Sequence, residues 1–118
     1  MLTFYGYAKC STCRNAKKLL TQAGVTFDEI DITTAPPDAS TLQAAIDSGV
    51  APKALLNTSG QQYRQLNMKE KLPGMTTEEL VDLLAGNGRL IKRPIVTDGT
   101  RFTVGLKDDF ESTWIGDQ

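Results

Sequence analysis

The chain has 118 residues, of which 40% are apolar and 23% charged, so its composition is that of one globular domain rather than of a disordered segment. Its formal net charge of −1 gives no reason to expect direct binding to nucleic acid or to an anionic membrane. Two cysteines and no histidine cannot complete a four-ligand structural zinc site, so no metal is expected, and they exclude any catalytic triad that needs histidine.

The first third of the chain predicts a strand, a helix and a second strand. Residues 2–5 form a short apolar strand, and apolar residues recur at helical spacing from Ala16 to Ala23 before Gly24 ends the helix. The apolar residues Val25, Phe27, Ile30 and Ile32 predict the second strand. A strand, helix and strand within some thirty residues form a βαβ unit, in which the two strands are parallel.

The middle of the chain, about residues 33–91, predicts a helical insertion. Ser40 is expected to cap a first helix, with Gln43 three residues later as its capping-box partner. Thr76 and Glu79 predict the same arrangement for a second helix. Short helical pieces are expected around Leu55-Leu56 and around residues 63–66.

The last third predicts two strands and a helix. Residues 94–96 and 101–104 flank Asp98-Gly99, which is a strong hairpin signal, and a final helix is expected over about 107–114. The prediction is therefore an α/β protein with a βαβ…ββα sheet and a helical insertion, folded as one domain over residues 1–118.

Cys10 and Cys13 stand where the loop after the first strand becomes the helix. Backbone N–H groups at that position lack partners within the helix and favour a thiolate. Cys10, at the edge of the loop, is the expected nucleophile, and Cys13, one turn later on the same face, is the expected resolving thiol. A CxxC motif placed in this way indicates redox chemistry, although buried structural cysteines and a metal site shared between two chains are alternatives.

The residues around the motif are polar or basic. Ser11 and Thr12 separate the cysteines, and Lys9 and Arg14 flank them, so these four are candidate substrate-binding residues. Positive neighbours also lower the pKa of a thiol.

The start of the chain reads as a strand rather than as a signal peptide, and no apolar run approaches the roughly 18 residues of a membrane span. We therefore expect a cytoplasmic monomer that does not bind membranes. In that reducing compartment a CxxC motif is more often redox-active than structural.

Four ordered motifs give the chain a resemblance to a known family. The first runs from Phe4 through the two cysteines to Lys17. The others are Leu56–Gly60 with Tyr63–Leu66, then Ile91–Ile95, and finally Val104-Gly105. Together they resemble the ArsC, Spx and YffB group of arsenate reductase-like proteins, most closely its small members that carry a CxxC motif.

This resemblance implies a thioredoxin fold with a helical insertion. It also implies that Pro94 is a cis proline opposite the thiols and that Arg93 binds an oxyanion or substrate anion, for which a guanidinium fork is well suited. The implied activity is that of a glutathione- or thioredoxin-linked thiol reductase, with no bound cofactor and with glutathione, glutaredoxin or thioredoxin as electron donor. Its substrate would be a disulfide, a glutathione mixed disulfide or a small oxyanion.

Two departures from the arsenate-reducing members are visible. Lys53 stands in register with one of their arginines, and no arginine stands at residues 103–105. A lysine supplies charge without the planar fork, so weak or absent arsenate reduction is expected. Lys53 is kept as a candidate substrate-binding residue.

Spx provides the alternative function. It has the same CxxC motif and is a redox-sensing transcriptional regulator that binds the RNA polymerase α subunit. The chain differs from Spx at residues 57–60 and at Lys92-Arg93, where Spx has two adjacent arginines. The sequence leaves reductase and regulator open, together with the true substrate and the resting redox state of the cysteines.

Overall fold

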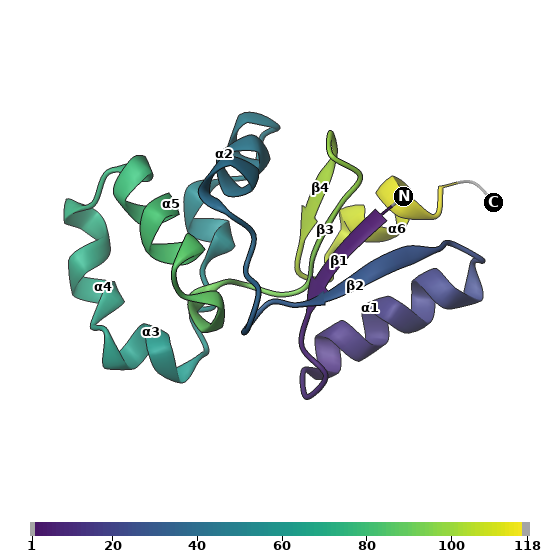
Figure 1. Ribbon diagram of the computed structural model, residues 1–118, viewed down its shortest axis with the longest axis horizontal. Helices are drawn as coiled ribbons and strands as arrows, with labels where there is room; N and C mark the ends of the chain where they lie inside the picture. Colours follow the sequence, from purple (N-terminus) through teal and green to yellow (C-terminus); the bar gives the residue numbers. More distant parts are fainter. Residues whose placement is uncertain (1, 117–118) are drawn as a thin grey trace.

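A four-stranded sheet lies at the centre of the computed structural model, which describes residues 2–116 (Figure 1). Its strand order is β2-β1-β3-β4, with β1 parallel to β2, and with β3 antiparallel to both β1 and β4. The strands are β1 (Leu2–Gly6), β2 (Phe27–Asp31), β3 (Ile95–Thr97) and β4 (Phe102–Val104). The parallel β1 and β2 and the hairpin of β3 and β4 confirm the predicted βαβ and ββ units.

Two helices pack against the sheet through one apolar cluster, which we call the sheet core. They are α1 (Ser11–Gln22), which connects β1 to β2, and α6 (Asp108–Trp114) at the other end of the chain. Gly24, with a φ of +75°, follows α1 and ends it as predicted. The sheet core consists of Leu2, Phe4, Cys13, Ala16, Leu20, Val96, Phe110 and Trp114.

The chain between β2 and β3 is helical and gathers to one side of the sheet (Figure 1). Its apolar residues form a second cluster, the helical core, made of Ile32, Leu42, Leu55, Leu56, Met68, Leu80, Val81, Leu84, Leu90, Ile91, Ile95 and Val104. Its helices are α2 (Ala39–Asp47), α3 (Gln61–Gln65), α4 (Met68–Lys71) and α5 (Thr77–Ala85), with the 3₁₀ turns η1 (Pro52–Leu55), η2 (Leu72–Gly74) and η3 (Gly88–Leu90).

The predicted start of α2 is wrong by two residues. Asp38, not Ser40, is the N-cap, and its carboxylate accepts hydrogen bonds from the backbone of Thr41 at 2.9 Å and from the Ser40 hydroxyl at 3.0 Å. The Gln43 side chain instead donates to Asp47 within the helix. A charged carboxylate is the stronger acceptor for unpaired N–H groups, so the aspartate takes the position. The second capping box is confirmed, because Thr76 and Glu79 each accept from the other's backbone N–H.

The α/β class and the thioredoxin-like arrangement are thus confirmed. The Arg93–Pro94 peptide bond is cis, as the resemblance implied. Within residues 2–116 no helix has both the length and the apolar character needed to span a membrane.

Candidate active site

Cys10 is the N-cap of α1, and its sulfur accepts a hydrogen bond from a backbone N–H in the first turn of the helix. The distance from the Cys13 nitrogen to the Cys10 Sγ is 3.3 Å. Cys10 has extended backbone angles, φ −93° and ψ 116°, so it belongs to the loop while its carbonyl already accepts from Arg14 at 3.1 Å. Its side chain is half-buried, which leaves the sulfur accessible to another molecule.

The two thiols have opposite pKa shifts. For Cys10, desolvation raises the pKa, but the hydrogen bonds from Cys13 and the donors and charge of the Arg93 guanidinium outweigh it, so the pKa is lowered. For Cys13, which is 0% exposed, desolvation comes first and the neighbouring Cys10 sulfur adds to it, which raises the pKa to about 12. Cys10 is therefore the more acidic of the two thiols and is the one that ionises first, while Cys13 stays protonated.

Arg93 reaches the site from the segment that leads into β3. Its guanidinium carbon lies 5.1 Å from the centre of the Tyr7 ring, in the loop before the thiols. The positive charge is therefore held beside Cys10 by an aromatic face rather than by a carboxylate. Pro94 follows it and is buried, and its carbonyl accepts from Gly105 at 2.8 Å, so this segment is fixed to the end of β4.

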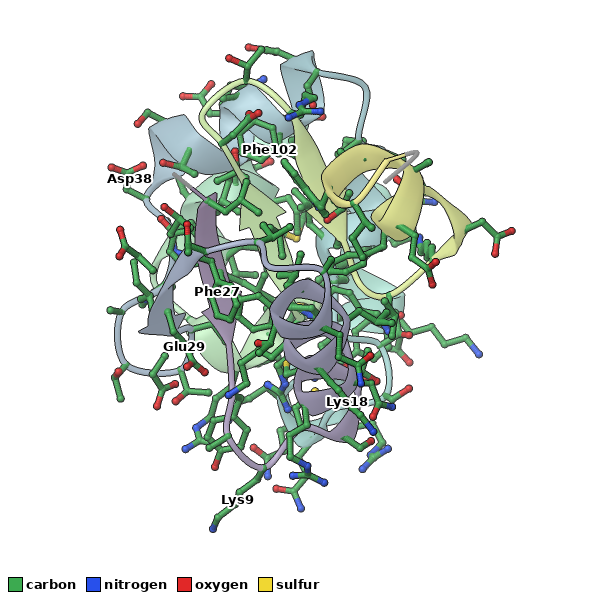
Figure 2. The ribbon with its side chains drawn as sticks, turned by 90° about the vertical axis from the view of Figure 1, so that its right-hand side faces the viewer. Lys9, Lys18, Phe27, Glu29, Asp38 and Phe102 are labelled. Carbon is green, nitrogen blue, oxygen red and sulfur yellow. The ribbon has the colours of Figure 1, made fainter. Side chains whose placement is uncertain are left out.

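The structure brings Cys10, Cys13 and Arg93 together, but not every predicted basic residue. Lys9 is exposed and points away from the body of the protein (Figure 2). Arg14 donates to the Ala8 carbonyl at 3.0 Å, so it braces the loop before α1. Lys53 lies in η1, where it lines a groove with Leu72 and other residues of the helical segment, and it is not among the groups that shift the pKa of either thiol.

The two residues between the cysteines begin the helix. Ser11 is exposed and Thr12 is partly buried in the first turn of α1.

A cavity of about 220 Å³ adjoins Arg93 and was not predicted from the sequence. Its other lining residues come from the helical segment, and a second arginine, Arg89, is among them. The sequence pattern gave Arg89 no role, although Asn57 lies in one of the four motifs that carry the family resemblance. The cavity is lined by Asn57, Gly60, Gln61, Gln62, Arg89 and Arg93.

The arrangement suits thiol–disulfide exchange. A half-exposed thiol with a lowered pKa stands one helical turn from a buried thiol, and an arginine lies beside it. Within residues 2–116 no group of three histidine, cysteine or acidic side chains is placed to hold a metal ion.

The chain is similar to known proteins over most of its length. The ArsC family model matches residues 5–111 of the chain. The uncharacterised protein YusI of Bacillus subtilis (strain 168) is 51% identical over 115 residues, which cover 96% of this chain and 98% of that protein. The global transcriptional regulator Spx of Enterococcus faecalis is 30% identical over 92% of this chain and 82% of its own.

A solved structure shares the fold. A possible arsenate reductase from Streptococcus mutans UA159 superposes with a TM-score of 0.89 at 43% identity, covering 96% of this chain and 97% of that one.

Proposed function

The chain belongs to the ArsC family, and we propose that within this family it is a disulfide-directed thiol oxidoreductase, with Cys10 as nucleophile and Cys13 as resolving thiol. The observation that carries the proposal is the asymmetry of the two thiols. Cys10 is half-exposed with a lowered pKa, whereas Cys13 is fully buried with a pKa raised to about 12. A reactive anion and a protected partner one turn apart support attack in a fixed order.

In the first step the Cys10 thiolate attacks one sulfur of a substrate disulfide. A bond forms between Cys10 and that sulfur, the substrate S–S bond breaks, and the other half leaves as a thiolate that takes up a proton from water. The charge at Cys10 is lost in this step. Because that charge and the hydrogen bond to Cys10 raise the Cys13 pKa, their loss makes the second thiol more acidic when it is needed.

In the second step Cys13 loses its proton and attacks the Cys10 sulfur. The mixed disulfide breaks, the remaining substrate half leaves as a thiol, and Cys10 and Cys13 are joined. The protein has then given two electrons to the substrate and must recover them from a thiol reductant. Glutathione, glutaredoxin or thioredoxin, the donors used by ArsC-family reductases, are the proposed class.

We propose that arsenate is reduced weakly or not at all. Among the described residues, Arg93 is the arginine of the expected oxyanion site that lies beside Cys10. Lys53 stands where arsenate-reducing members carry a further arginine, and a lysine lacks the planar fork. An arsenate turnover rate similar to that of a dedicated reductase would contradict this proposal.

The roles of the cysteines can be tested by replacing each one with serine. Cys10→Ser is expected to abolish reduction of a low-molecular-weight disulfide, while Cys13→Ser should stop after the first step and leave a mixed disulfide at Cys10 that mass spectrometry detects. Thr21→Ala, an exposed position near the other end of the same helix, is the matched control and should keep most of its activity. Full activity of Cys10→Ser would overturn the assignment.

The kinship with Spx supports a second candidate function, a redox-sensing protein that binds the RNA polymerase α subunit. The discriminating experiment is a pull-down of purified α subunit by the reduced and by the oxidised chain. Binding that depends on the redox state, together with slow disulfide turnover, would favour the regulator. Rapid turnover without binding would favour the reductase.

A further inference from the structure

The cavity beside Arg93 has the character of an anion site. It is lined by two arginines and by the amide side chains of Asn57, Gln61 and Gln62, and none of the described residues that line it is acidic. Its volume of about 220 Å³ admits a small charged group. Guanidinium and amide N–H groups are donors, and together they fit an anionic acceptor.

Arg89 and Arg93 both contact the Tyr7 ring, and both line the cavity. Their guanidinium carbons lie 5.9 Å and 5.1 Å from the centre of the Tyr7 ring. Two like charges brought together repel each other, and the ring offsets this only in part. An anion bound in the cavity would offset this repulsion.

Neither arginine has a carboxylate partner among residues 2–116, since the two ion pairs there are Lys17 with Glu29 and Arg101 with Asp98. The charge of Arg89 helps to lower the pKa of Asp31, but the Asp31 carboxylate accepts its hydrogen bonds from the backbone N–H and hydroxyl of Thr33, at 2.9 and 2.6 Å. The charge of Arg89 is therefore available to a ligand.

The walls of the cavity are fixed before any ligand arrives. Leu56 and Ile91 form an antiparallel bridge, and the Asn57 nitrogen donates to the Leu90 carbonyl at 2.8 Å. On the other side, Gln62 accepts from the Asn87 side chain at 3.1 Å. These bonds tie the segment that carries Asn57 to the segment that carries both arginines, so little ordering is needed on binding.

We propose that Arg89, with Arg93, binds a carboxylate of the substrate, and that the substrate class is disulfides whose thiol halves carry carboxylates. This rests on the proposed oxidoreductase function. Arg93 acts on the Cys10 sulfur, whereas the cavity that Arg89 lines includes no residue of the loop or helix that carries the two cysteines. A charge bound there lies beside the atom under attack rather than at it, which fits a carboxylate elsewhere on a disulfide better than a small oxyanion that itself reacts.

The test compares a charged and a neutral disulfide, dithiodiglycolate and bis(2-hydroxyethyl) disulfide. The pre-reduced full chain is mixed with an excess of each, quenched with acid, and its remaining thiols are counted by alkylation and mass spectrometry. Arg89→Met is expected to slow oxidation by dithiodiglycolate about tenfold, the loss typical of one charge-assisted hydrogen bond, and to change the neutral reaction less than about twofold. Arg89→Lys should recover part of the rate with the charged disulfide.

Arg64→Met, which removes an exposed arginine of the neighbouring α3 outside this cavity, is the matched control and should alter neither rate. Equal slowing with both disulfides would mean that Arg89 has a structural role, and no slowing with either would mean that it does not touch the substrate. Both results overturn the proposal. If the wild-type chain is not oxidised by either disulfide, it is instead the proposed oxidoreductase function that fails.

Discussion

The protein has two halves with different roles. The sheet half consists of the four strands with α1 and α6, and the helical half is the segment between β2 and β3. The sheet half positions the sulfur chemistry, because β1 leads directly into the loop that ends at Cys10 and Cys13 is part of the sheet core. The helical half contributes most of the cavity beside Arg93. The comparison suggests that reactivity is built locally at one helix terminus, whereas recognition depends on the contact between two distant parts of the chain.

The two halves meet at β3. Ile95 belongs to the helical core and its neighbour Val96 to the sheet core, because successive residues of a strand point to opposite faces. Arg93 stands immediately before this strand, so it lies beside Cys10 of the sheet half and also lines the cavity formed by the helical half. We infer that the two halves fold as one cooperative unit. Substitutions that lower the free energy of unfolding in one half should therefore destabilise both.

The largest expected effect is that of Leu84→Ala in the helical core. Leu84 is 0% exposed, and removing such a side chain costs about 3–4 kcal/mol of unfolding free energy. Trp114, the one tryptophan of the chain, lies in the sheet core and reports the other half. The denaturation midpoint should fall equally by tryptophan fluorescence and by far-UV circular dichroism.

The control for this prediction is Leu20→Ala, a fully buried leucine of the sheet core. It too should shift both signals together. If Leu84→Ala moved the dichroism transition and left the fluorescence transition in place, the two halves would be independent units.

Gly88→Ala tests the contact between the two halves and is expected to lower the free energy of unfolding by about 2–3 kcal/mol. A Cβ at this position would overlap the backbone carbonyl of Ile32, so η3 would have to move away from the end of β2. Gly74→Ala is the matched control, since a Cβ there meets nothing within 4 Å. Urea titration of both variants measures the difference, and equal stability would show that the close approach of η3 to Ile32 is not needed.

Much of the sheet half could be predicted from the sequence because its signals are local. Helical spacing from Ala16 to Ala23, the Gly24 stop and the Asp98-Gly99 turn each specify an element within a few residues. The helical half contains short turns whose borders depend on tertiary contacts. Ser40 and Asp38 are both good N-caps, and only the fold decided that the aspartate takes the free N–H groups.

The same distinction applies to the site. The roles of Cys10 and Cys13 follow from their place at a helix start, so local pattern was sufficient to propose them. The proximity of Arg89, Asn57 and Gln62 depends on the bridge between Leu56 and Ile91, which joins residues far apart in the chain. No spacing in the sequence reports such a contact.

A smaller effect is expected for Thr76→Ala at the start of α5. The Thr76 hydroxyl accepts from the Glu79 nitrogen at 3.1 Å, and losing such a cap costs about 1 kcal/mol. Thr77→Ala, one position later and without a capping bond, should cost only a few tenths of a kcal/mol. Because α5 contributes Leu84 to the helical core, the transitions followed by Trp114 fluorescence and by circular dichroism should shift equally. A shift confined to the dichroism signal would again indicate that the two halves unfold independently.

The smallest expected change in stability concerns the charge at Cys10, because its sulfur remains partly in water. The folded-state pKa of Cys10 is lowered below its unfolded value, so the ionised thiol stabilises the fold. That contribution is fully present above the unfolded pKa of roughly 8.5 and is lost as the pH falls through the folded pKa. The stability of the reduced wild type relative to Cys10→Ser should therefore decline as the pH is lowered through that window.

The rate of iodoacetamide alkylation of Cys10, measured in the Cys13→Ser chain over the same pH series, gives the folded pKa directly. Its midpoint should lie below that of a free cysteine, and Arg93→Met should move it upward, since Arg93 is one of the groups that favour the anion. Arg89→Met should leave the midpoint unchanged, because its role is proposed to be recognition. A midpoint at the ordinary alkaline value in the Cys13→Ser chain would mean that the helix start and Arg93 together do not activate the sulfur, and the division between local reactivity and distant recognition would no longer hold.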